Sequence, residues 1–91
     1  MNSLPVKIPI EGVLDLHTFN PKDVKILLPE YLNLCREKGI KEVKIIHGKG
    51  TGILKNLVLK QIEKINFVTG YKDAQLSDGG WGATIVFLNI E

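Results

Sequence analysis

Two histidines are the side chains of this sequence that could carry out acid–base chemistry, and each one ends a short apolar segment. Asp15 and His17 belong to Val-Leu-Asp-Leu-His at 13–17, and His47 follows Glu-Val-Lys-Ile-Ile at 42–46. Residues two apart on a strand point to the same side, so the Asp15 carboxylate could orient an imidazole and fix its tautomer. Either histidine could then act as a general base. The alternatives are that both are hydrogen-bonded structural residues, or that they and Asp15 bind a metal ion.

A glycine-rich run directly after His47 could bind an anion. It consists of Gly48, Lys49, Gly50, Thr51 and Gly52. The run leaves a predicted strand and enters a predicted helix, where unpaired backbone N–H groups and the helix dipole favour phosphate. Its spacing is neither that of a P-loop nor that of a dinucleotide fingerprint. The alternative is a tight turn that requires positive φ angles.

The periodicity predicts the elements that position these residues. Strands are predicted at 13–17, 42–46, 67–73 and 83–90, and helices at 20–38 and 53–65, with 74–82 as a loop. Asn20-Pro21 is a helix-start signal, Gly39 fits the helix end, and Pro29 should kink or divide the first helix. The order βαβαββ predicts an α/β fold, a two-layer sandwich with a four-stranded mixed sheet and two helices on one face. The other face should be largely bare.

Parallel pairing of the first two strands would bring the candidate residues together. His17 and His47 both lie at carboxyl ends of strands, which meet at one edge of a parallel pair, and this is where open α/β sheets bind ligands. Lys22 and Lys55, at the starts of the two helices, could flank a bound strand of nucleic acid. Trp81 could stack on a base or fold back over the sheet edge.

Composition is that of one globular domain. The 91 residues are 44% hydrophobic and 24% charged, and a single domain of this length has a radius of gyration near 12 Å. Apolar stretches stop at about five residues, far short of the ~18 that span a membrane. The N-terminus lacks the pattern of a signal peptide, and a single cysteine, Cys35, excludes an internal disulfide. We expect a cytoplasmic monomer with an N-terminal arm at 1–12 and a domain at 13–91. The net charge of +2 neither requires nor excludes a nucleic-acid partner.

Three motifs together resemble the Smr family of small MutS-related domains. They are Leu14-Asp15-Leu16-His17, the run from His47 to Gly52, and Gly79-Gly80-Trp81-Gly82-Ala83-Thr84-Ile85-Val86. The resemblance covers 13–90 and implies the βαβαββ fold. It also implies a stand-alone nicking endonuclease acting on DNA or RNA in repair, recombination or ribosome-linked mRNA quality control. The family motifs fall on Asp15, His17, His47, Gly48 and Gly50.

Two positions depart from the family pattern, and three functions remain open. Thr18 stands where many members have glycine, and Lys55 where an arginine is common. Cleavage of RNA through its own 2′-hydroxyl needs no metal, whereas cleavage of DNA would call for a divalent ion such as Mg²⁺ or Mn²⁺. The alternative is a module that binds nucleic acid or a ribosomal surface without cutting it. A small nucleotide-binding protein is the third reading.

Overall fold

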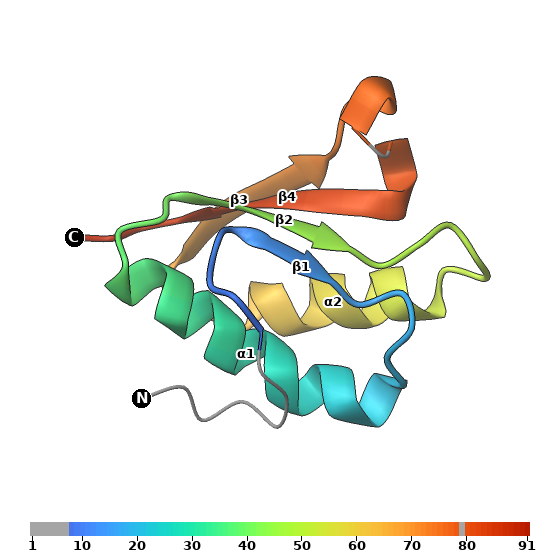
Figure 1. Ribbon diagram of the computed structural model, residues 1–91, viewed down its shortest axis with the longest axis horizontal. Coiled ribbons are helices and arrows are strands. Elements are labelled where there is room, and N and C mark those ends of the chain that lie inside the picture. The colour runs from blue at the N-terminus through green and yellow to red at the C-terminus, as the bar shows by residue number, and fades with distance from the viewer. Residues whose placement is uncertain (1–7, 79) are drawn as a thin grey trace.

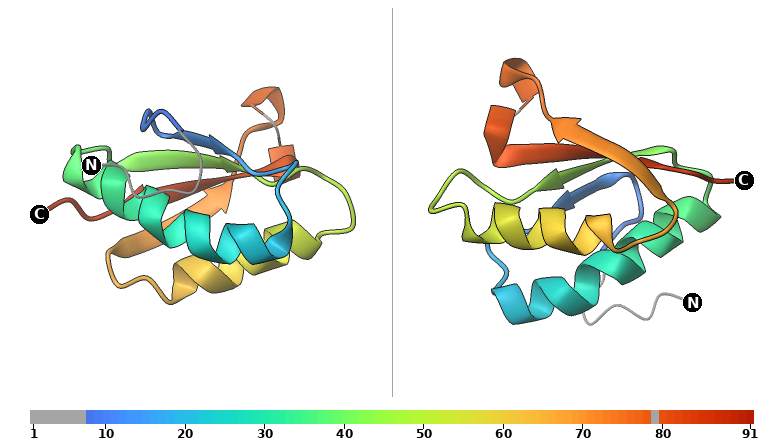
Figure 2. Two further views of the ribbon diagram at one scale, coloured as in Figure 1. Left: turned by 60° about the horizontal axis from the view of Figure 1, so that its bottom comes forward. Right: turned by 180° about the vertical axis from the view of Figure 1, so that it is seen from behind.

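The computed structural model describes residues 8–78 and 80–91 and has two layers (Figure 1). The strands are β1 (Val13–Asp15), β2 (Glu42–Ile46), β3 (Val68–Asp73) and β4 (Ala83–Leu88), and the helices are α1 (Pro21–Glu37) and α2 (Ile53–Glu63). Both helices lie against the same face of the sheet in every view (Figure 2). The predicted βαβαββ order and the α/β sandwich are confirmed, with a radius of gyration of 12.0 Å.

The last strand of the chain lies inside the sheet. The strand order is β1-β2-β4-β3, so β4 separates β2 from β3. β1 and β2 are parallel, as predicted, and β4 is antiparallel to both of its neighbours. The buried strand residues Leu14, Ile45 and Val86 pack with residues of both helices into one core. This packing fixes the register, because a slip by one residue would turn these side chains outward.

Helix α1 begins where the sequence predicts it. The Asn20 side chain accepts a hydrogen bond of 2.9 Å from the Asp23 amide, and Pro21 is the first helical residue. Pro29 was predicted to kink or divide this helix; division is wrong, because α1 continues from Pro21 to Glu37. The ring of Pro29 removes the hydrogen bond that would reach the Lys25 carbonyl. Lys25 is exposed, so water can replace the missing donor.

Several predicted elements are longer than the observed ones. β1 ends at Asp15 and not at 17, β4 ends at Leu88, and α2 ends at Glu63. The predicted loop at 74–82 contains two short 3₁₀ turns, Leu76–Asp78 and Gly80–Gly82. Of the predicted arm, residues 1–7 lie outside the described residues, whereas Ile8 and Ile10 are half-buried and pack against the core.

The sheet face opposite the helices is less bare than expected. The connection between β3 and β4 rises on that side (Figure 1). Ala74, Ala83 and Ile85 are buried there as a second small cluster, against which Ile46 and Phe87 pack. No helix among the described residues is long and apolar enough to cross a membrane.

Candidate functional site

One pocket lies at the carboxyl ends of the parallel strands β1 and β2. It has a volume of about 350 Å³ and is lined by His17, His47 and the eight residues from Gly48 to Lys55. The loop after β1 and the loop after β2 therefore meet at one edge of the sheet, as the parallel pairing predicts. Both histidines and the whole glycine-rich run border the same space.

Asp15 and His17 form a hydrogen-bonded pair on the exposed side of this edge. The distance from Nδ1 of His17 to Oδ1 of Asp15 is 2.5 Å, and the same oxygen accepts the His17 backbone N–H at 3.0 Å. A carboxylate only accepts, so Nδ1 carries a proton, and in the neutral form of the ring Nε2 carries the lone pair. About half of each side chain is exposed, at 56% for His17 and 49% for Asp15.

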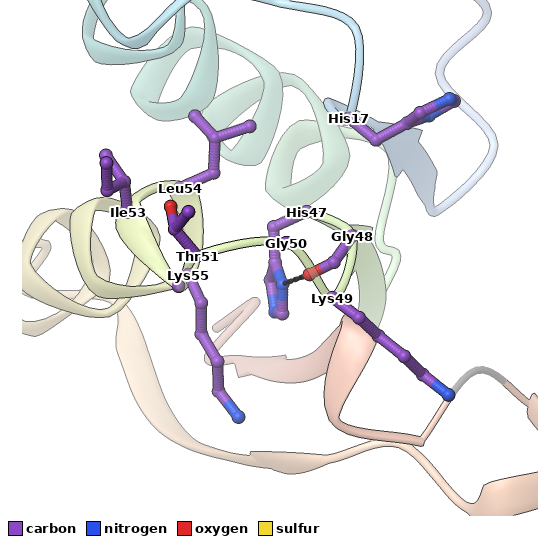
Figure 3. Close-up of a pocket in the computed structure, with 10 residues that line it drawn as sticks. His17, His47, Gly48, Lys49, Gly50, Thr51, Ile53, Leu54 and Lys55 are labelled. Atoms are coloured by element: carbon purple, nitrogen blue, oxygen red, sulfur yellow. Dashed lines mark hydrogen bonds between the residues drawn. The ribbon is translucent and has the colours of Figure 1, made fainter.

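The Asp15 carboxyl is held in its ionised form. Partial burial raises its pKa, but the hydrogen bonds from the His17 side chain and amide and the charge of the imidazole outweigh this. The pKa of Asp15 therefore lies below its ordinary value. Figure 3 shows the His17 ring turned away from the ring of His47. The Cβ end of the His17 side chain therefore lines the pocket, whereas the imidazole points away from it.

His47 differs from His17 in that it is buried. Only 4% of the residue is exposed, and both of its ring nitrogens have partners. Nε2 lies 2.8 Å from the Thr84 hydroxyl, and Nδ1 lies 3.1 Å from the Gly48 carbonyl. Burial lowers the pKa of His47 and outweighs the hydrogen bond to the Gly48 carbonyl, which raises it; the charges of Lys55 and Asp73 make smaller contributions, which lower and raise it respectively. The ring is therefore neutral at pH 7.

The glycine-rich loop and the first residues of α2 line one side of the pocket. Gly48 and Gly52 have φ angles of 82° and 86°, a region that favours glycine. Lys49, Gly50 and Thr51 are exposed between them. Gly52 is the N-cap of α2 and has no side chain with which to occupy the first amides of the helix. Those amides, together with the helix dipole, form an arrangement suited to an anion.

Lys55 and Trp81 form a second cationic and aromatic group beside His47. The Lys55 ammonium lies 3.0 Å from Oδ1 of Asp73 and 5.5 Å from the centroid of the Trp81 ring. Trp81 is 45% exposed, so one part of the indole remains open to solvent. Figure 3 shows Lys49 and Lys55 extending on either side of the His47 ring. Lys22 is exposed in the first turn of α1, and the described residues that line the pocket include neither Lys22 nor Trp81.

Three residues of the site were missed by the sequence analysis. Thr84 contacts His47, Asp73 contacts Lys55, and the Gly82 carbonyl accepts the amides of His47 and Gly48 at 3.1 and 2.9 Å. All three belong to β3, β4 or the turn before β4. The strand order places these elements beside β2 and α2, and the available signal was a threonine in an otherwise apolar strand.

Few side chains at this edge of the sheet could coordinate a metal ion. Among residues 8–78 and 80–91 no group of three or more His, Cys, Asp or Glu side chains could hold a metal ion. Asp15 and His17 lie together, whereas both nitrogens of His47 are engaged elsewhere. An ion at this edge would therefore take two protein ligands and complete its shell with water or substrate oxygens, as Mg²⁺ commonly does.

Sequence comparisons match nearly the whole chain to one domain family. The Smr domain matches residues 14–89. The chain is 35% identical over 79 residues to a protein named Endonuclease MutS2 from Finegoldia magna, covering 87% of this chain and 10% of that protein. It is 36% identical over 75 residues to Endonuclease MutS2 from Carboxydothermus hydrogenoformans, covering 82% and 10%. The chain thus spans about a tenth of the length of these relatives.

Two solved structures share the fold. The Smr domain of Thermus thermophilus MutS2 superposes with a TM-score of 0.82 at 26% identity, covering 87% of this chain and 99% of that one. YdaL, a stand-alone small MutS-related protein from Escherichia coli, superposes with a TM-score of 0.83 at 26% identity, covering 91% and 68%. The likeness extends over both layers of the sandwich.

Proposed function

The chain belongs to the Smr domain family, and we propose that it is an endonuclease that nicks DNA or RNA. The observation that carries the proposal is the Asp15–His17 pair, which lies at the border of the amide-lined pocket. The relatives named endonucleases support it, since this chain corresponds to one domain of theirs. Hydrolysis of a phosphodiester needs a base for the nucleophile and stabilisation of charge on the phosphoryl oxygens. The two parts of the site are suited to these two tasks.

The phosphate would bind at the glycine-rich loop. The amides between Gly48 and Gly52 and the start of α2 supply donors, and the exposed Lys49 supplies a positive charge. Such donors are held in place before substrate binds, so they act on the developing charge without rearrangement. Lys55 and Lys22 would contact the flanking backbone, and the exposed part of Trp81 would stack on a base.

His17 would act as the general base. Asp15 holds the proton on Nδ1, which leaves Nε2 to accept a proton from the attacking group. In RNA the attacking group is the neighbouring 2′-hydroxyl, and in DNA it is water. Asp15 and His17 are the residues that would hold a divalent ion, and such an ion would supply water of lowered pKa, which would make the second reaction easier. This requirement would distinguish DNA cleavage from RNA cleavage.

The second candidate function is binding without cleavage. The exposed indole of Trp81 beside Lys55 favours it, because an aromatic ring next to a cation is a common platform for single-stranded nucleic acid. On either proposal the partner is DNA or RNA, including mRNA on ribosomes, and the protein acts as a cytoplasmic monomer. The buried, reduced Cys35 is consistent with that compartment.

A cleavage assay separates the two functions. Purified protein is incubated with supercoiled plasmid and with labelled single-stranded RNA, each with Mg²⁺, Mn²⁺ or EDTA. If the protein is a nuclease, the wild type should yield nicked plasmid or shortened RNA, and His17→Ala should yield neither product. Binding of the same oligonucleotides by fluorescence anisotropy, without any cut by the wild-type protein, would leave only the binding module.

A further inference from the structure

Thr84 and His47 form a buried polar contact behind the glycine-rich loop. Both side chains are buried, at 0% exposure for Thr84 and 4% for His47. The 2.8 Å hydrogen bond between them joins β4 to the end of β2 across 37 positions of sequence. Each group of such a pair depends on the other, because removing one would leave the other buried without a hydrogen-bond partner and without access to water.

The partners of His47 determine where its proton lies. The Gly48 carbonyl can only accept, so Nδ1 of His47 must be the donor in their 3.1 Å contact. The neutral ring then has a lone pair on Nε2, to which the Thr84 hydroxyl donates. Burial disfavours a charged imidazolium more strongly than the contact with the Gly48 carbonyl favours it, and the neighbouring Lys55 disfavours it by more than Asp73 offsets. Thr84 therefore faces a neutral ring whose orientation is fixed at both nitrogens.

The turn before β4 also holds the backbone next to Gly48. The amides of His47 and Gly48 both donate to the Gly82 carbonyl, at 3.1 and 2.9 Å. The Gly48 carbonyl is bound by the imidazole, so both peptide groups that meet at this residue are held by β4, the turn before it or His47. Beyond this point the chain turns outward into the exposed Lys49, Gly50 and Thr51.

We propose that Thr84 is a positioning residue for the phosphate site. Its hydroxyl holds His47 in the Nδ1–H tautomer, and His47 in turn holds the Gly48 carbonyl so that the following amides face the pocket. On this account, which rests on the proposed function, His47 acts through the loop and transfers no proton to or from substrate. The assignment leaves His17 as the imidazole that exchanges protons with the reacting groups.

The tautomer can be measured on the folded protein without any substrate. Because the chain has two histidines, the His17→Asn variant contains a single imidazole, and its ring nitrogens can be read from long-range ¹⁵N–¹H correlation spectra at pH 7.5. We expect a neutral ring with the proton on Nδ1. A proton on Nε2, or a charged ring, overturns the proposal whether or not the protein proves to be a nuclease.

A pair of variants tests the link to the loop. Thr84→Val keeps the side-chain volume and removes the hydroxyl, whereas Thr84→Ser keeps the hydroxyl and loses a methyl group. Leaving a buried nitrogen without its partner should raise the KM for a single-stranded oligonucleotide by about tenfold, with kcat within about threefold. It should also speed hydrogen exchange of the Gly48 amide by about tenfold. Thr84→Ser should restore both values to within about threefold.

Three outcomes would count against the proposal. The first is exchange at Gly48 that is equal in the two variants. The second is a fall in kcat as large as that of His17→Ala with KM unchanged, since this would place His47 in the proton-transfer step. The third is a Thr84→Val protein that binds as well as wild type. If Thr84→Val does not fold, the tautomer measurement decides. If the wild type cuts no substrate, the exchange and tautomer measurements still test the loop, and only the endonuclease proposal fails.

Discussion

Gly48 and His17 lie directly against each other, so that a Cβ built on Gly48 would be 3.4 Å from the Cβ of His17. This contact joins the loop after β2 to the turn after β1. The two strands are neighbours, with Asp15 paired to Ile46, so the backbone itself sets the spacing between the exposed imidazole and the amide-lined pocket. On the proposed mechanism, a rotation of the His17 side chain would bring the base to the phosphate without movement of the backbone.

Removing the imidazole of His17 should abolish cleavage and spare binding. His17→Ala should lower the cleavage rate by about 100-fold or more, the usual contribution of a general base. Asp15→Asn should lower it by a smaller factor, because the ring remains but loses the acceptor that fixes its tautomer. Glu37→Gln is the matched control, since it removes one negative charge from the last residue of α1. Cleavage by His17→Ala within a few-fold of wild type would remove this residue from the mechanism.

Lys49 should contribute through its charge. Its side-chain stem lies along Gly82, where a built Cβ would meet its Cγ at 2.9 Å, and the residue is exposed. Lys49→Ala should weaken binding to all sequences alike and reduce the slope of log affinity against log salt by about 1. Lys64→Ala, a cation lost at the other end of α2, should leave the slope unchanged. Equal slopes for both variants would show that Lys49 contacts no phosphate.

Trp81 should report binding through its fluorescence. It is the one tryptophan of the chain, so the signal is specific to it. Single-stranded oligonucleotide should quench the indole, and Trp81→Ala should weaken binding by about 1–3 kcal/mol, the range for stacking of a base on an aromatic ring. Tyr71→Ala, another exposed aromatic, serves as the control. An unchanged spectrum at saturating oligonucleotide would mean that the ring packs only against Lys55.

Gly48 and Gly50 should differ in their tolerance of a side chain. Gly48 has a φ of 82°, a conformation that is strained for a residue with a Cβ, so Gly48→Ala should destabilise the fold by about 1–2 kcal/mol. A Cβ on Gly50 would meet no atom within 4 Å, so Gly50→Ala should change stability by no more than about 0.5 kcal/mol. Urea unfolding followed by circular dichroism measures both. Similar losses for the two variants would contradict the loop geometry.

His47 should make the fold less stable in mild acid. Its folded-state pKa is lower than the ordinary 6.5 of the unfolded chain. Below about pH 6.5 the unfolded state therefore binds the proton more readily, and the free energy of unfolding falls until the pH drops below the folded pKa. The His47→Gln variant should show a shallower fall between pH 7.5 and 5.5. The lowered pKa of Asp15 affects stability in a separate, more acidic pH range, because its contribution to the free energy of unfolding is lost only as the pH falls below its ordinary 3.8. Parallel curves for wild type and His47→Gln would contradict the burial effect.

Local signals predicted the elements of this fold, whereas contacts between distant segments decided their ends. Asn20-Pro21 predicted the start of α1 because capping depends on a few adjacent residues. The same sequence suggested that Pro29 would kink or divide the helix, but α1 is not divided, because its core contacts on both sides of Pro29, from Val24 to Tyr31, hold it together. Strand β1 is shorter than predicted because its partner β2 ends at Ile46, opposite Asp15.

The candidate site was predicted where it depends on parallel strand ends and missed where it depends on β4. Asp15 and His17 are neighbours in sequence, so their pairing could be predicted from spacing alone. The burial of His47 could not, because it follows from the place of β4 between β2 and β3, which brings Thr84 to the ring. For the same reason the sequence could not show that Asp73 holds Lys55 beside Trp81.

The position of β4 has a consequence for the order in which the protein matures during translation. β4 is the last strand of this domain in chain order, yet it lies inside the sheet and, with the turn before it, supports the loop that follows β2. A nascent chain that has been synthesised only as far as α2 carries Asp15, His17 and every loop glycine but lacks their scaffold. Such a chain should be inert, and competence should arise in a single late step when the final strand inserts.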